Sequence, residues 1–300
     1  MKNYYEIIEE NKFKSNIIIL GFILFISFSA YFISYAIGSD SSALLFAVII
    51  SSIASIGSYY YSDKIILSMS SARLATKKEF FDYYTVTENL TKVARLPMPR
   101  LYVIDDTAMN AFATGRDPEH AVICATTGLL HRLNRSEIEG VVAHELSHIR
   151  HFDIRLMSII TVLVGSVTLL ADWLLRYSFF NNRKRDNEND NMQMLMFLLG
   201  LVFAMLSPII AQIIQLAVSR RREFFADAGA VSLTKNPQGL IRALEKISLD
   251  TEPLEAANKA TAHLYISNPL KNNKSAVGWF SNLFATHPPV KERIKALQGH

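Results

Sequence analysis

The chain has 300 residues, of which 50% are hydrophobic and only 19% are charged, and its mean hydropathy is +0.18. A charged fraction below the roughly 25% of an average globular protein favours an integral membrane protein. The formal net charge of +4 does not indicate a nucleic-acid partner, because the basic residues cluster beside apolar runs, as they do at a cytoplasmic membrane face. The single cysteine, Cys124, excludes an intrachain disulfide, and its apolar neighbours predict a core position rather than a nucleophile.

Two uncharged apolar runs occupy the N-terminal part of the chain, at residues 17–38 and 41–62. A helix rises about 1.5 Å per residue, so each run is long enough to cross about 30 Å of hydrocarbon. The link between them, around Ser39 and Asp40, is very short. Residues 1–62 are therefore predicted to form a transmembrane helical hairpin.

The next segment carries the pattern of a small α+β domain. A helix is predicted over residues 78–95, and it is expected to end there because Pro97 and Pro99 follow closely. Strands are predicted at residues 101–104 and 120–124, where short apolar runs occur. Ser136 and Glu139 have the spacing of a capping box, which predicts the start of a helix.

The short segment from Asn110 to Gly115 lies between these strands and has small side chains. Proteins can hold an extended peptide against the edge of a sheet through main-chain hydrogen bonds, and this segment has the form of such an edge. It is equally well described as an ordinary strand that ends in a turn. The residues alone leave both interpretations open.

The most informative motif is His-Glu-Leu-Ser-His at residues 144–148. On a helix, His144 and His148 lie one turn apart on the same face, so both imidazoles can bind one zinc ion. Glu145 then lies beside the metal, where its carboxylate can act as general base on water that the metal activates. The alternative is a pair of surface histidines on an ordinary helix.

Two further apolar runs, residues 156–175 and 192–219, predict a second transmembrane hairpin. If there are four spans, most of the lysines and arginines that flank them lie on one side of the membrane. The excess of positive charge places that side in the cytoplasm. Both chain termini and the histidine motif are therefore expected in the cytoplasm.

A catalytic zinc ion usually takes three protein ligands, and Glu223 is the best candidate for the third. His151 lies a turn beyond His148, so a solvated or supporting role is expected for it. Asp227 shares a helical face with Glu223 and can accept a hydrogen bond from a ligand imidazole. The two spans between His148 and Glu223 return the chain to the same side of the membrane. Glu223 has an alternative role as a counter-ion for the arginines at residues 220–222.

Four motifs, in this order, resemble the HtpX group of membrane zinc endopeptidases, which is related to the CaaX-prenyl proteases. They are Asn-Ala-Phe-Ala-Thr-Gly at 110–115, His-Glu-Leu-Ser-His at 144–148, Glu-Phe-Phe-Ala-Asp at 223–227 and Thr-His-Pro-Pro at 286–289. The resemblance extends from about residue 75 to the C-terminus. The four predicted spans also match the architecture of the group.

The resemblance implies a quality-control endopeptidase of the bacterial inner membrane that cleaves misfolded or damaged membrane proteins at the cytoplasmic face. By position, His144, His148 and Glu223 would bind one Zn²⁺ per chain, and Glu145 would be the general base. The expected partners are polypeptide substrates and the lipid bilayer, without nucleic acid.

The resemblance also implies roles for four other residues. Asp227 would support a ligand imidazole, and Asn110 would contact the main chain of the substrate. His287 and Arg293 resemble a pair that faces the tetrahedral intermediate in the related prenyl proteases. A helix N-terminus after a proline pair explains His287 and the two prolines that follow it equally well.

The expected fold is a mainly α integral membrane protein with four transmembrane helices and a cytoplasmic, zincin-like α+β catalytic domain with a small β-sheet. The hairpins are residues 1–62 and 156–219, and the catalytic parts are residues 63–155 and 220–300. The alternatives are a CaaX-type processing protease and a non-catalytic membrane scaffold with structural zinc. A structural site needs a fourth protein ligand, usually cysteine. Proteolysis within the bilayer is disfavoured by the arginines around the histidine motif.

Overall fold

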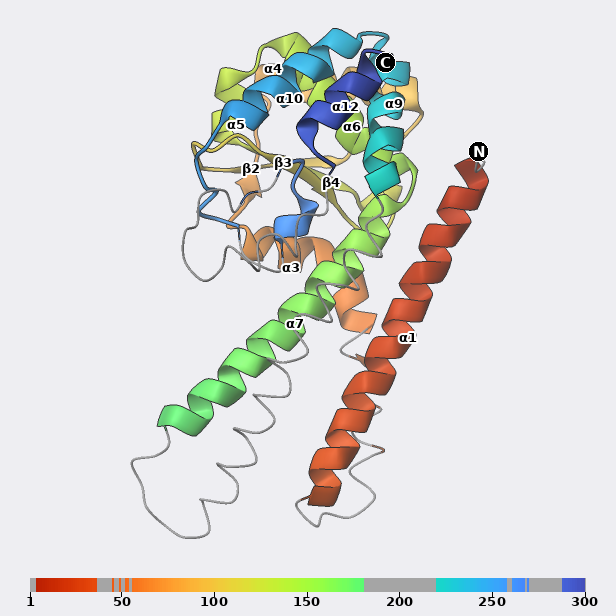
Figure 1. The fold of residues 1–300 in the computed structure, drawn as a ribbon, viewed down its shortest axis with the longest axis vertical. Helices are drawn as coiled ribbons and strands as arrows, with labels where there is room; N and C mark the ends of the chain where they lie inside the picture. Colours follow the sequence, from red (N-terminus) through yellow and green to blue (C-terminus); the bar gives the residue numbers. More distant parts are fainter. Residues whose placement is uncertain are drawn as a thin grey trace.

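The computed structural model describes residues 4–36, 45, 49, 52–53, 56–180, 220–257, 261–267, 269 and 288–299. Among these residues, a small sheet and several short helices form one body, and two long helices extend beyond it (Figure 1). The long helices are α1 (Tyr4–Ala36) and α7 (Asp153–Phe180), which contact each other.

The sheet has the strand order β1-β2-β4-β3. β2 and β4 are parallel, whereas β1 and β3 run antiparallel to their neighbours. Every residue of β3 and β4 is buried, which is typical of strands covered on both faces. The strands are β1 (Arg73–Leu74), β2 (Arg100–Ile104), β3 (Ala111–Thr114) and β4 (Val122–Thr126).

The alternation of side chains along the strands divides the interior into two cores. Ile123 and Ala125 of β4 belong to the larger core, together with residues of α4 (Phe81–Ala94) and α6 (Arg135–Arg150). Cys124 and Phe112 point to the opposite face and join the smaller core with α3 (Ser62–Met69) and α7. The prediction that Cys124 is a core residue is therefore confirmed.

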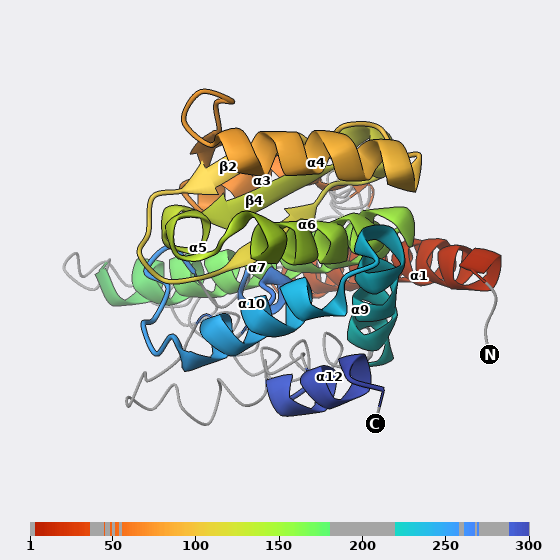
Figure 2. The ribbon, with the colours of Figure 1, turned by 90° about the horizontal axis from the view of Figure 1, so that it is seen from above.

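Three C-terminal helices pack against the larger core: α9 (Arg220–Thr234), α10 (Pro237–Leu249) and α12 (Val290–Leu297). Figure 2 shows α6 lying between α4 and α10, and α6 also packs against α9. The approach of α6 and α10 is very close, since a Cβ built on Gly140 would lie 2.6 Å from the main-chain nitrogen of Leu240. The helix that carries the histidine motif is thus enclosed on several sides.

The predicted helices and strands are present, with shifted boundaries. α4 and β2 occupy the predicted ranges 78–95 and 101–104 to within three residues. β4 begins two residues later than the strand predicted at 120–124, because Pro118–His120 forms a short 3-10 helix. The Asp117 carboxylate caps this helix by accepting a hydrogen bond from the His120 N–H at 2.8 Å. The short helix α5 (Thr127–Arg132) follows β4 directly.

The predicted start of the motif helix was wrong by two residues. The capping box of α6 consists of Asn134 and Glu137 rather than Ser136 and Glu139. The Glu137 N–H donates to Asn134 Oδ1 at 3.0 Å, and the Asn134 N–H donates to the Glu137 carboxylate at 2.9 Å. The sequence contains two overlapping pairs of a capping residue and a glutamate with the same spacing, and asparagine caps a helix as well as serine does.

The four predicted transmembrane runs are covered unequally by the described residues. The runs at 17–38 and 156–175 fall almost entirely within α1 and α7. Half of the run at 41–62 and all of the run at 192–219 lie outside the described residues. Within the described ranges, no helix combines the length and the hydropathy needed to cross a membrane.

Candidate active site

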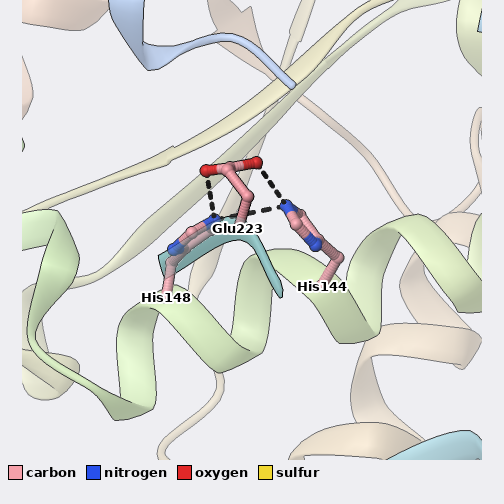
Figure 3. A group of neighbouring side chains, drawn as sticks. All are labelled: His144, His148 and Glu223. Atoms are coloured by element: carbon pink, nitrogen blue, oxygen red, sulfur yellow. Dashed lines mark hydrogen bonds and ion pairs between the residues drawn. The ribbon is translucent and has the colours of Figure 1, made fainter. Parts of the chain in front are cut away.

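The two motif histidines face a common point from α6. Their rings lie edge to face with centroids 4.7 Å apart, and their Nε2 atoms are 3.2 Å apart. Glu223 approaches the pair from α9, as Figure 3 shows. Its two carboxylate oxygens lie 3.6 Å from His144 Nε2 and 3.6 Å from His148 Nε2. The structure therefore brings together the three residues that the sequence predicted as ligands.

The geometry of these three residues fits a zinc ion. One ligand atom from each lies within 4.8 Å of the others. Zinc binds imidazole nitrogen at about 2.0–2.1 Å, so two nitrogens of a tetrahedral site are about 3.3 Å apart. The 3.2 Å between the two Nε2 atoms is close to this separation. Two imidazoles and one carboxylate are the donor set of a catalytic site, which leaves a fourth position to water.

A carboxylate holds the outer nitrogen of each histidine. His144 Nδ1 lies 2.9 Å from Asp227 Oδ1, and His148 Nδ1 lies 3.0 Å from Asp153 Oδ2. If each Nδ1–H donates to its carboxylate, the lone pair of each Nε2 is directed into the site. Such partners fix the tautomer and the orientation of a ligand imidazole. The structure thus places Asp227 beside His144, in agreement with the role expected for it.

Asp153 was missed by the sequence analysis, although it holds His148 as Asp227 holds His144. It is the first residue of α7, and Phe152 before it has a φ of 59°, which separates α7 from α6. A spacing of five residues from His148 matches no helical repeat, so periodicity could not identify it. The only available signal was an acidic residue close to the histidine motif.

Arg293 of α12 brings a buried positive charge to the site. Its side chain is fully buried, and its Nε and Nη2 donate to the two carboxylate oxygens of Asp227 at 2.9 and 2.7 Å. Its Nη1 lies 3.4 Å from a Glu223 oxygen, and its Nη2 lies 3.4 Å from both ring nitrogens of His144. His287, which the sequence analysis paired with Arg293, lies outside the described residues.

The environment changes the proton affinities of the site residues. Burial and the charge of Arg293 lower the pKa of His144 to about 4, against the hydrogen bond to Asp227. Burial opposes protonation of His148 as well, but the hydrogen bond to Asp153 and the charge of Glu223 raise its pKa to about 9. Burial raises the pKa of Glu145 to about 7, and the charge of Glu223 acts in the same direction. A bound divalent cation favours the deprotonated form of each of these groups.

A small pocket lies beside the ligands, and Glu145 is part of its wall. Its volume of about 30 Å³ is room for about one water molecule and not for a peptide. The main-chain N–H of Ala113, in β3, donates a hydrogen bond to the Glu145 carboxylate. Its lining also includes Ile154 and Met157 of α7, and His263, Leu264 and Ile266 of the segment 261–267.

The segment 261–267 also lies against the outer edge of β3. The Ile266 N–H donates to the Ala111 carbonyl at 2.9 Å. Asn110 binds the main chain of Ser267 twice, because its Nδ2 donates to the Ser267 carbonyl at 3.0 Å and its Oδ1 accepts from the Ser267 N–H at 3.3 Å. Asn110, expected to hold the main chain of a substrate, here holds the main chain of the protein itself.

His151 does not join the ligands in the structure. It follows the last residue of α6, and its main-chain N–H donates to the Ser147 carbonyl at 3.0 Å. Among the described residues, the group that can hold a metal contains His144, His148 and Glu223 and does not include His151.

Comparison with known proteins identifies the family of the chain. Residues 78–300 match the family described as Peptidase family M48. A "Protease HtpX homolog" of Dictyoglomus thermophilum is 43% identical over 299 residues, which cover 98% of this chain and 94% of the relative. A "Protease HtpX homolog" of Ligilactobacillus salivarius is 40% identical over 297 residues, which cover 98% of this chain and 99% of the relative.

A solved structure is also similar, namely the crystal structure of S. mikatae Ste24p. The match has a TM-score of 0.49 and 20% sequence identity, and covers 92% of this chain and 62% of that chain. The family match and the relatives, which align over nearly the whole of both chains, confirm the resemblance that the motifs indicated. We conclude that the chain is a zinc-dependent endopeptidase of peptidase family M48 and belongs to its HtpX group.

Proposed function

We propose that His144, His148 and Glu223 hold one zinc ion and that Glu145 is the general base of peptide hydrolysis. The observation that carries this proposal is the convergence of three ligand atoms within 4.8 Å from helices that are remote in sequence. Zinc bound there supplies a Lewis acid that activates water and polarises the scissile carbonyl.

The proton transfers belong to Glu145. Its carboxylate takes a proton from the attacking water and returns it to the leaving amine, so water and peptide yield a carboxylic acid and an amine. Burial raises the pKa of Glu145, which helps its carboxyl group to hold the proton between the two transfers. Asp227 and Asp153 keep the two imidazoles oriented during these transfers.

We propose that the peptide substrate pairs with the outer edge of β3. Main-chain pairing at this edge already occurs, since Ala111 accepts a hydrogen bond from the segment 261–267. The Ala113 N–H, two residues further along the same edge, is directed toward Glu145. A substrate strand at this edge brings a peptide bond to the pocket, provided that residues 264–267 give way to it.

We infer further that the chain is a four-span protein of the bacterial cytoplasmic membrane that degrades misfolded or damaged membrane proteins. The support comes from the four apolar runs and from the distribution of lysine and arginine around them. The catalytic parts, residues 63–155 and 220–300, then lie in the cytoplasm with both termini. Two spans between His148 and Glu223 leave both at the same face.

Two substitutions test the assignment of roles. Purified, zinc-loaded chain is incubated with casein in detergent, and zinc content is measured by elemental analysis. Glu145→Gln is expected to keep zinc and to lose cleavage, whereas Glu223→Ala is expected to lose both. Glu139→Gln, on the same helix and partly exposed, is the control that keeps both.

Unchanged cleavage by Glu145→Gln would remove Glu145 from the mechanism. Unchanged zinc content in Glu223→Ala would exclude Glu223 as a ligand. Cleavage of a prenylated CaaX peptide in preference to casein would favour a processing protease. Failure of the wild-type chain to cleave in several detergents would favour a scaffold, although Cys124, the only cysteine, is not among the metal-binding residues.

A further inference from the structure

Asn11, on the N-terminal helix α1, has a buried side-chain amide that makes three hydrogen bonds to other elements. Its side chain is almost fully buried, with a relative exposure of 1%. Its Nδ2 donates to Asp153 Oδ1 at 2.8 Å and to the His151 carbonyl at 2.9 Å. Its Oδ1 accepts from Arg222 Nη2 at 2.6 Å. One amide therefore joins the end of α6, the start of α7 and the start of α9.

Two of the three partners of Asn11, Asp153 and Arg222, adjoin a proposed zinc ligand. Asp153 uses one carboxylate oxygen for Asn11 and the other for His148 Nδ1. Arg222 directly precedes Glu223 on α9, and its Nη1 lies 3.4 Å from Asp153 Oδ1. The network thus links α1 to His148 through the Asp153 carboxylate, and to Glu223 through Arg222, the residue that precedes it.

No other side chain of similar size satisfies this network. An asparagine amide donates two hydrogen bonds and accepts others at the same time. An aspartate would place an acceptor opposite the Asp153 carboxylate and the His151 carbonyl, where donors are needed. A hydrophobic residue would leave buried polar groups without a partner, which costs free energy for each group.

We propose that Asn11 is a positioning residue of the metal site, so that α1 is part of the catalytic machinery as well as a membrane anchor. Asn11 fixes the Asp153 carboxylate, which orients His148, and it fixes Arg222 beside Glu223. Removal of a group that holds a ligand directly typically weakens metal affinity about 10- to 100-fold, so a residue one contact further out is expected to act at the lower end of this range. This role rests on the proposed zinc site.

The test compares zinc affinity in the full-length chain. The dissociation constant for zinc is measured by competition with a chelating indicator for wild type, Asn11→Asp and Asn11→Ser. The serine variant keeps a polar group and leaves space for water. The matched control is Asn16→Asp, because Asn16 lies on the same helix and its exposed side chain contacts Arg155 of α7 at 3.0 Å without reaching the site.

We expect both Asn11 variants to raise the zinc dissociation constant about 10-fold, and Asn16→Asp to leave it within about twofold. Combining Asn11→Asp with Asp153→Asn restores a donor between the two positions and is expected to recover part of the affinity. Thermal unfolding of the metal-depleted chains separates this role from simple docking of α1. A lower unfolding temperature with unchanged zinc affinity in both Asn11 variants would overturn the proposal.

The outcome also distinguishes this inference from the proposed function. If Glu223→Ala loses zinc while the Asn11 variants bind it as tightly as wild type, the role of Asn11 alone is wrong. If Glu223→Ala retains zinc, the proposed ligand set is wrong and the role of Asn11 is wrong with it.

Discussion

One buried guanidinium balances the buried carboxylates behind the zinc ligands. Arg293 is fully buried, and its planar fork matches both oxygens of Asp227. Asp227 in turn holds His144, so the charge of Arg293 is linked to a ligand through a single side chain. A charge removed from water is stable only when it is paired and hydrogen bonded. The Arg293 side chain is therefore required for the structure of the site, independently of any contact that it makes with the substrate.

Arg293→Ala is expected to lower the free energy of unfolding by about 3–5 kcal/mol, because it leaves the buried Asp227 carboxylate without its cation. The measurement is chemical denaturation of the metal-depleted chain. The control is Lys77→Ala, which removes an exposed ion pair with Glu88 at 2.8 Å and should cost about 1 kcal/mol or less. Equal losses in the two variants would show that the Arg293 pair is no stronger than a surface pair.

Among the elements, α6 does most to place the site, because it carries two ligands and the general base. Its contacts with α9 and α10 depend on small residues at the crossings. A Cβ on Gly140 would lie 2.6 Å from the Leu240 nitrogen, and one on Gly229 would lie 2.5 Å from the Ser147 hydroxyl oxygen. The spacing of the histidines predicts their common face, but only these close contacts bring Glu223 to that face.

Gly140→Ala is therefore expected to destabilise the protein by about 1–3 kcal/mol, since the backbone of α10 must move. Helix propensity alone predicts the opposite, a gain of about 1 kcal/mol. Gly21→Ala in α1 is the control, because a Cβ there meets no atom within 4 Å. Thermal unfolding of both variants measures the difference. A Gly140→Ala variant as stable as Gly21→Ala would show that the contact between α6 and α10 tolerates a methyl group.

In the whole molecule, the proposed zinc ion joins α6 to α9, two helices separated along the chain by the predicted second transmembrane hairpin, whose first span lies in α7. A ligand that binds only the folded state stabilises it by about 2.7 kcal/mol at 100 times its dissociation constant. Since the site exists only when α6 and α9 are packed together, zinc binding and folding are coupled.

Chelation of zinc is thus expected to lower the thermal unfolding temperature of the wild-type chain and to abolish cleavage. Zinc added back should restore both properties. In Glu223→Gln, which weakens the proposed site, chelation should change the unfolding temperature little. The comparison is made by scanning fluorimetry in the same detergent. A wild-type chain whose unfolding temperature is insensitive to chelation would contradict the link between the two helices.

The motifs of the chain predicted the family, the three proposed ligands and the general base. These predictions were possible because a helix repeats every few residues, so local spacing places His144, Glu145 and His148 on known faces. The helix at 78–95 and the strands at 101–104 and 120–124 were also predicted, with shifted boundaries, and the cap of α6 was displaced by two residues. Asp227 was predicted for the same reason as the histidines, since it lies one turn from Glu223.

The remaining features of the site were decided by tertiary packing. Asp153 supports His148 across a break between two helices, and Arg293 reaches Asp227 from α12. Asn11 reaches both α7 and α9 from the N-terminal helix. Each of these contacts joins residues whose separation along the chain matches no repeat of a helix or strand. Only the packing of the elements against one another brings such groups within hydrogen-bonding distance.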